Sequence, residues 1–203
     1  MTSVSNRVLS EAVFLEDRSL IWAKRVVLWA AGIALLIASA KITVPMWPSP
    51  VPISMGTFAV LTIGAAYGPR LGLATIMGYM LIGAMGFDVF VGSSAEKYGL
   101  TYMMGGTGGY LVGYVLATVV LGALARRKWD RSVPMMALAM LIGNALIYVP
   151  GVAWLGYLYS GSQGWATVLD WGLWPYLVGD GLKLALAALL LPAVWKLVGA
   201  ART

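Results

Sequence analysis

Long stretches without a charged residue constrain the fold of this chain more than any other feature. Residues 26–40, 105–124 and 134–157 contain no Asp, Glu, Lys or Arg, and apolar runs of about twenty residues are typical of transmembrane helices. Only 11% of the 203 residues are charged, against about a quarter in a soluble domain. Because so few charges cannot form a polar shell, lipid must cover much of the surface. We therefore expect an all-α integral membrane protein.

The breaks between apolar segments predict six transmembrane helices. These breaks are a proline-rich segment at 44–52, a turn at Gly68-Pro69-Arg70, a polar segment at 87–104, a basic loop at 126–131 and a polar connection at 160–172. The helices are expected at residues 26–40, 53–67, 71–87, 105–124, 134–157 and 174–198. The chain thus divides into a leader, 1–25, and a six-helix transmembrane domain, 26–203.

The leader mixes charged and apolar residues, which predicts a short amphipathic helix or a loose tail. The first transmembrane helix reaches about twenty residues if Lys24, Arg25 and Lys41 snorkel from its ends. A cleaved signal peptide is the alternative, because Ala38-Ser39-Ala40 has the small-residue form of a cleavage site. The long charged leader argues against that alternative.

The distribution of Lys and Arg predicts the orientation in the membrane. With six spans, the amino terminus, the Arg70 turn, the 126–131 loop and the carboxyl end share one side, which holds eleven of the fourteen basic residues. Positively charged loops stay in the cytoplasm, so both termini should be cytoplasmic. The three loops on the opposite side would cover a pocket that faces outward.

Composition excludes several classes of function. The sequence contains no cysteine and no histidine, so it lacks thiolate nucleophiles, histidine bases and the commonest zinc ligands. It also offers no convergent pair of intramembrane carboxylates. We therefore expect no enzyme activity, no metal and no cofactor. The net charge of +6 does not indicate nucleic acid, because the basic residues do not form one stripe.

Asp180 and Lys183 are the strongest functional signal, because ionisable residues are costly inside a transmembrane helix. Their spacing of three residues places both side chains on one helix face, where they can pair and still offer an acceptor and a donor to a ligand. A structural ion pair without a ligand is the alternative. We favour a ligand-binding role, because a buried ion pair without a function is easily replaced by apolar residues.

Other candidate ligand contacts surround this pair in the predicted bundle. They are Tyr176, Thr107, Tyr110, Asn144, Tyr148 and Gly92. The tyrosines could instead belong to the aromatic belt at the membrane interface, and Asn144 could bond a neighbouring helix. The glycines around Thr107 lack the lysine of a phosphate-binding loop, so they indicate close backbone approach to a helix or a ligand.

Ala30, Ala34 and Ala38 follow one another at four-residue spacing in the first transmembrane helix. They form a smooth strip on which another helix could lie. The strip could serve packing within the same bundle or docking of a partner.

The chain resembles the BioY family, the biotin-binding substrate-capture (S) components of energy-coupling-factor (ECF) transporters. The resemblance extends over all six predicted helices. It rests on segments 50–54 and 57–61, Gly68-Pro69-Arg70-Leu71-Gly72, segment 79–86, Val89-Phe90, segment 107–114 and segment 175–183. The chain departs from the family pattern at Gly56, Gly106 and Phe87-Asp88. These departures affect the details of the loops that would cover the pocket.

The resemblance implies high-affinity biotin uptake through a six-helix S component in the bacterial inner membrane, with ligand contacts by Asp180 and Lys183. It also implies that the alanine strip docks on a transmembrane coupling (T) protein driven by cytoplasmic ATPases. The ureido N–H groups of biotin would donate to Asp180, and Lys183 would donate to the ureido oxygen or to the carboxylate. The alternatives are an S component for another vitamin, a proton-coupled carrier of a small anion and a membrane assembly factor.

Overall fold

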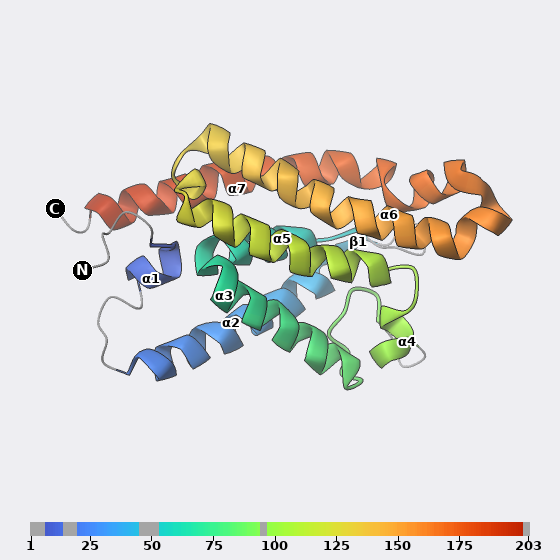
Figure 1. Cartoon of the computed structure of the whole chain (residues 1–203), viewed down its shortest axis with the longest axis horizontal. Helices are drawn as coiled ribbons and strands as arrows, with labels where there is room; N and C mark the ends of the chain where they lie inside the picture. Colours follow the sequence, from blue (N-terminus) through green and yellow to red (C-terminus); the bar gives the residue numbers. More distant parts are fainter. Residues whose placement is uncertain (1–6, 14–19, 45–52, 94–96, 201–203) are drawn as a thin grey trace.

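The computed structural model describes residues 7–13, 20–44, 53–93 and 97–200, and most of them are helical (Figure 1). Five long helices contain most of the described residues, and two short helices and a 3-10 turn connect or precede them. In order, the helical elements are α1 (Leu9–Val13), α2 (Ile21–Lys41), α3 (Gly56–Ala84), α4 (Gly99–Met103), α5 (Gly108–Arg126), η2 (Trp129–Arg131), α6 (Val133–Gly172) and α7 (Trp174–Ala200).

Two of the long helices change direction at a glycine with positive φ. Gly68 (φ 76°, ψ 176°) divides α3 and Gly164 (φ 79°, ψ 158°) divides α6, a conformation that residues with a side chain rarely adopt. The two parts of α3 pack closely, since a Cβ built on Gly72 would lie 3.5 Å from the Cα of Gly64. The turn expected at residues 68–70 is therefore present as a sharp kink.

The structure corrects several expected boundaries. The polar connection expected at 160–172 is helical apart from the kink at Gly164. The helix expected from residue 26 begins at Ile21, and the helix expected from residue 105 begins at Gly108. Residues 53–54 form β2 (Ile53–Ser54), which pairs antiparallel with β1 (Thr43–Val44), and the proline-rich segment between these strands lies outside the described residues. Residues 160–172 are helical despite their polar side chains, because a helix satisfies the hydrogen bonds of its own peptide groups.

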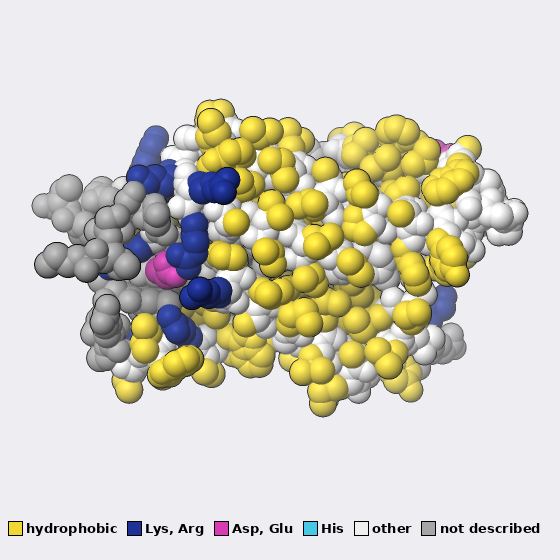
Figure 2. All heavy atoms as spheres, viewed as in Figure 1, with side chains coloured by type: hydrophobic (Ala, Val, Ile, Leu, Met, Phe, Trp, Pro, Cys, Tyr) yellow, Lys and Arg dark blue, Asp and Glu magenta, His cyan; other side chains and the backbone are white. Residues whose placement is uncertain are grey.

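The helices are long and apolar enough to cross a membrane. Among the described residues, four stretches meet both conditions: Ile21–Lys41, Gly56–Ala84, Gly108–Arg126 and the α6–α7 stretch Val133–Val198. Hydrophobic side chains cover much of the visible surface between the two ends of the molecule (Figure 2). The protein is therefore a multi-pass membrane protein.

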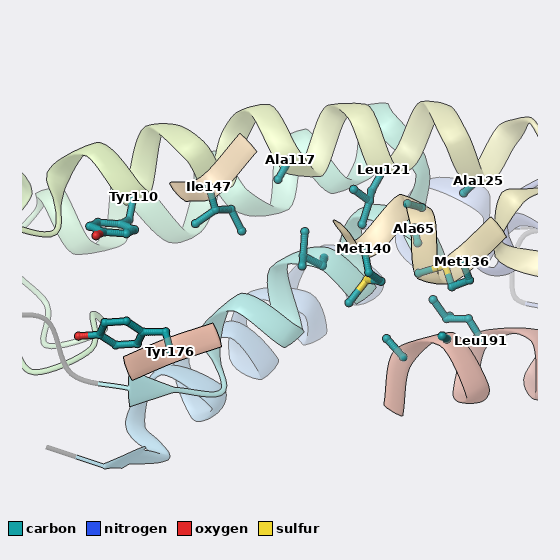
Figure 3. Close-up of a cluster of buried hydrophobic side chains, with 14 of the residues drawn as sticks. Ala65, Tyr110, Ala117, Leu121, Ala125, Met136, Met140, Ile147, Tyr176 and Leu191 are labelled. Atoms are coloured by element: carbon teal, nitrogen blue, oxygen red, sulfur yellow. The ribbon is translucent and has the colours of Figure 1, made fainter. Parts of the chain in front are cut away.

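Two buried clusters hold the bundle together. One joins α3, α5, α6 and α7, and Figure 3 shows its side chains, with Met140 and Leu191 near one end and Tyr110 and Tyr176 near the other. The second cluster joins α2 and α3 to the 89–102 segment. Small residues permit the closest approach: a Cβ on Gly113 of α5 would lie 2.6 Å from the Cα of Ile147 of α6.

The two ends of the molecule differ in their elements and charges. α1, the Gly68 kink, η2 and the last turns of α7 meet at one end, where Val8 contacts Gly68 and Trp195 donates to Asp130. The β1–β2 pair, the 85–103 segment and the Gly164 kink lie toward the opposite end (Figure 1). We call these the basic end and the hairpin end, because Arg126, Arg127, Lys128, Arg131 and Lys196 belong to the first.

Candidate functional site

A cavity in the hairpin half of the bundle contains the buried ion pair. Its walls come from α2, β2, α3, the 90–107 segment, α5, α6 and α7, and it encloses about 720 Å³ of unoccupied space, its open mouth included. Ligand pockets for small molecules are mostly apolar with a few placed polar groups. This cavity has that character, because most of its wall is aliphatic or aromatic and its two charged side chains, Asp180 and Lys183, lie together on α7.

Asp180 and Lys183 form the polar part of the wall. The Lys183 Nζ donates to Asp180 Oδ1 at 2.9 Å, and the two side chains are 12% and 6% exposed. The same ammonium donates to the Ser54 carbonyl oxygen at 2.6 Å and to Thr57 Oγ1 at 3.1 Å. All three of its protons therefore have an acceptor, which offsets much of the desolvation cost of a buried charge.

The Asp180 carboxylate is also held by several donors. The Tyr148 hydroxyl donates to Oδ2 at 2.5 Å, and the Thr57 hydroxyl donates to Oδ1 at 3.4 Å. Together with Lys183, these donors fix the carboxylate from α3, α6 and α7. A carboxylate has about four lone-pair positions, so one position remains, and the long Thr57 bond is the weakest of the three.

Aromatic side chains form much of the remaining wall. Phe90 stacks on Tyr102 with ring centroids 4.9 Å apart and meets the Tyr79 ring edge-on at 5.3 Å. Tyr110 and Tyr176 donate their hydroxyl protons to backbone acceptors, Gly172 O at 2.8 Å and Trp171 O at 2.9 Å. Their polar groups are thus satisfied by the protein, and their ring faces are left for apolar contact.

The segment after α3 closes over the cavity and is fastened at several points. Tyr79 and Tyr102 donate to the Val89 and Val91 carbonyls at 3.1 and 2.6 Å. Burial raises the pKa of Tyr102 to about 12, so its hydroxyl keeps the proton that it donates.

At the outer edge of this segment, Lys41 at the end of α2 contacts Asp88 and Phe90. Its Nζ lies 2.6 Å from Asp88 Oδ1 and 3.1 Å from the Phe90 carbonyl oxygen. Hydrogen bonds from Lys41 and from Ser93 lower the pKa of Asp88. The pair is partly exposed, with side chains 37% and 62% accessible, so it joins the segment to α2 without a large gain in stability.

Six of the eight residues expected at the ligand site line this cavity: Asp180, Lys183, Tyr176, Thr107, Tyr110 and Tyr148. Two do not. Asn144 lies one helical turn from Tyr148 toward Met140, and Gly92 is exposed in a turn with φ 65° beside the lining residue Val91. Ala30, Ala34 and Ala38 are all exposed on α2, on the side away from the buried residues Ile33 and Leu36.

Several wall residues were not singled out as candidates from the sequence. Ser54 contributes its backbone oxygen, which does not depend on its side chain. Thr57 and Tyr79 lie in apolar stretches, where a single hydroxyl residue does not indicate a binding role. All three residues lie in segments that resemble the family, and this was the available signal. Tyr114 of α5 also lines the cavity.

A lipid-covered bundle around a largely apolar cavity with a buried ion pair defines a membrane protein that binds a small molecule. The comparisons with known proteins define the family. The model of the BioY family matches residues 8–200, and the chain belongs to this family.

Two curated relatives illustrate the similarity. A probable biotin transporter BioY of Pyrococcus horikoshii is 34% identical over 83% of this chain and 94% of its own length. A biotin transporter BioY of Thermotoga maritima is 33% identical over 79% of this chain and 90% of its own length.

A solved structure shares the fold. It is the crystal structure at 2.1 Å of the S-component for biotin from an ECF-type ABC transporter. The TM-score is 0.74 at 22% sequence identity, over 86% of this chain and 92% of the other.

Proposed function

We propose that this protein captures biotin outside the membrane as the substrate-specific component of an ECF-type vitamin transporter. Membership of the BioY family supports this proposal, as does the name of the solved structure with the same fold. The single observation that carries it is the buried Asp180–Lys183 pair, which lies in the wall of an aromatic cavity.

The chemistry of biotin matches this wall. Its ureido group has two N–H donors and one carbonyl acceptor, and its fused sulfur ring is apolar. Asp180 accepts hydrogen bonds only, so an N–H of the ureido group takes its remaining lone pair or displaces the long bond from Thr57. The ring then lies against aromatic faces such as those of Tyr110 and Tyr176.

Lys183 supplies the complementary donor. Its protons already bond Ser54, Thr57 and Asp180, so the ammonium exchanges one of these bonds for a ligand oxygen, which is either the ureido oxygen or the carboxylate. An exchange of one charge-assisted hydrogen bond for another costs little, whereas a buried charge left without a partner is expensive. The site therefore favours a ligand that satisfies both residues together.

We further propose that the kinked helices give six membrane crossings, with both termini in the cytoplasm. The five long helices, with α3 divided into two at Gly68, support this count, and the chain reverses at Gly164 between the crossings of α6 and α7 (Figure 1). The collection of basic residues at the basic end supports the orientation. The cavity then opens outward under the 85–93 segment, in the inner membrane of a bacterial cell.

The exposed alanine strip of α2 is proposed as the docking surface for the coupling protein of the ECF module. Ala30, Ala34 and Ala38 present no side chain beyond a methyl group, so another helix can approach the α2 backbone closely. Cytoplasmic ATPases bound to that coupling protein would then supply the energy, and this chain would supply the ligand.

Calorimetric titration of the purified chain with biotin tests the site. We expect Asp180→Asn and Lys183→Ala each to lose at least about 2 kcal/mol of binding free energy, which is about thirtyfold in affinity, because each leaves a buried partner unpaired. Asp170→Asn and Lys196→Ala are the matched controls, since both residues are exposed and lie outside the cavity wall. Unchanged affinity in both site variants would contradict the proposed site.

A further inference from the structure

A second cavity lies at the basic end, between α1, α2, α3 and α5, and it shares no lining residue with the first. Its polar wall contains Glu11, Arg25, Arg70 and Arg126. Three arginines against one glutamate leave an excess of positive charge in the wall. Figure 2 shows Lys and Arg side chains gathered at this end, beside hydrophobic surface.

One of these arginines is neutralised within the protein. Arg126 Nη2 lies 2.6 Å from Glu11 Oε1, and Nη1 lies 3.4 Å from Oε2, so α1 is attached to α5 by a two-point ion pair. Arg25 lies over the Trp22 ring at 5.4 Å. In the described part of the chain, no carboxylate pairs with Arg25 or Arg70. Two guanidinium groups therefore remain available to an anion.

Apart from Ser10 and the Tyr67 hydroxyl, the rest of the wall is apolar, and hydrogen bonds between α2 and α3 hold it in place. Trp29 Nε1 donates to the Ala74 carbonyl oxygen and the Tyr67 hydroxyl to the Leu28 carbonyl oxygen, both at 2.9 Å. On the open side, Trp22 and Val26 are 73% and 60% exposed. The cavity thus has a cationic part and an apolar part that continues onto the surface of α2.

We propose that this cavity binds the phosphate headgroup of an anionic phospholipid, with an acyl chain along the apolar surface of α2. Guanidinium groups match phosphate oxygens in paired hydrogen bonds. Basic pockets between transmembrane helices on the cytoplasmic side suit anionic headgroups, and tryptophan is typical of this depth. A free phosphate would use the arginines alone and leave the exposed Trp22 and Val26 without a role. The bound lipid bridges α2, which carries the alanine strip, and α3.

Native mass spectrometry of the full chain in detergent, titrated with equal amounts of phosphatidylglycerol and phosphatidylcholine of identical acyl chains, tests this proposal. We expect the chain to retain phosphatidylglycerol preferentially. The double variant Arg25→Gln/Arg70→Gln should bind it at least about tenfold more weakly, because each basic residue near a membrane surface contributes to the attraction of anionic lipid. Its binding of phosphatidylcholine should not change.

The control removes the same number of charges from the same end. Arg127→Gln/Lys196→Gln affects two exposed residues outside the cavity and should keep the preference for phosphatidylglycerol. Biotin binding in both double variants reports that they are folded, because neither touches the first cavity. Equal retention of the two lipids by the unmodified chain, equal loss in both double variants, or complete displacement of phosphatidylglycerol by millimolar inorganic phosphate would each overturn the proposal.

Discussion

Asp180 and Lys183 keep their place in an apolar bundle because three elements supply partners to them. Ser54, Thr57 and Tyr148 complete the hydrogen bonds that the ion pair alone leaves open. Breaking a buried pair by removing one partner costs about 3–5 kcal/mol, so the network also fixes α7 against α3 and α6. The same residues thus serve both packing and the proposed ligand exchange.

Thr57 is the residue whose bonds the ligand is expected to replace. Its hydroxyl bridges Lys183 and Asp180, and Thr57→Val removes this bridge at nearly constant volume. We expect biotin to bind more tightly by about 1 kcal/mol, or about fivefold in affinity, because the ligand no longer has to displace the Thr57 bonds from the two charged groups. Titration calorimetry measures the change.

Thr62→Val is the matched control on the same helix. The Thr62 hydroxyl donates to Phe58 O at 2.7 Å within α3 and does not line the cavity. Its replacement should leave biotin affinity unchanged. Equal effects of the two substitutions would show that helix stability, and not the bridge, accounts for the change in affinity.

Sequence reasoning predicted the two charged residues of the cavity wall and four neutral ones, but it did not single out Ser54, Thr57 or Tyr79. Asp180 and Lys183 stand out because their cost in an apolar helix requires an explanation. A backbone oxygen such as that of Ser54 leaves no trace in the side-chain pattern. Asn144 was expected at the site, but it lies beyond the end of the cavity wall, one turn below Tyr148. The depth of a cavity along a helix depends on the neighbouring helices, which local sequence does not specify.

At the level of the elements, apolar runs predicted the helices well and their connections poorly. The turn at Gly68 was predicted because Gly-Pro interrupts a helix. The segment 160–172 was expected to be a loop because Ser160, Gly161 and Gly164 favour loops, yet only Gly164 leaves helical geometry. A helix at the surface can be as polar as a loop, so composition alone does not distinguish the two.

Gly164 and Gly161 offer a direct test of this difference. Both have open space around the position of a Cβ, and Gly164 alone has a positive φ. Gly164→Ala should lower stability by about 1–3 kcal/mol through backbone strain, whereas Gly161→Ala should raise it by about 0.5–1 kcal/mol, as alanine does within helices. Thermal melting in detergent checks the signs. A stabilising Gly164→Ala would mean that the chain does not reverse at this glycine.

At the level of the whole molecule, the ligand site and the proposed docking surface are separate. The cavity lies in the hairpin half, and the alanine strip lies outward on α2. We expect Ala34→Leu to leave biotin binding intact and to weaken association with the coupling protein by up to about 1–3 kcal/mol, because the added side chain overfills a close helix contact. Copurification with the coupling protein and ATP-driven uptake measure this effect.

Ala185→Leu on α7 is the control for that substitution, because Ala185 is also exposed but lies on another helix. Normal uptake by the Ala34 variant, or the same loss of uptake in both variants, would contradict the proposal that the alanine strip docks on the coupling protein.

The central claim is that the cavity recognises the ureido group of biotin. Titration of the purified chain with biotin, and with an analogue whose ureido nitrogen carries a blocking group, tests it most directly. We predict one tightly bound biotin per chain and binding of the analogue that is at least about thirtyfold weaker, since a buried Asp180 then lacks its donor. No binding of biotin, or equal binding of both compounds, would contradict the account.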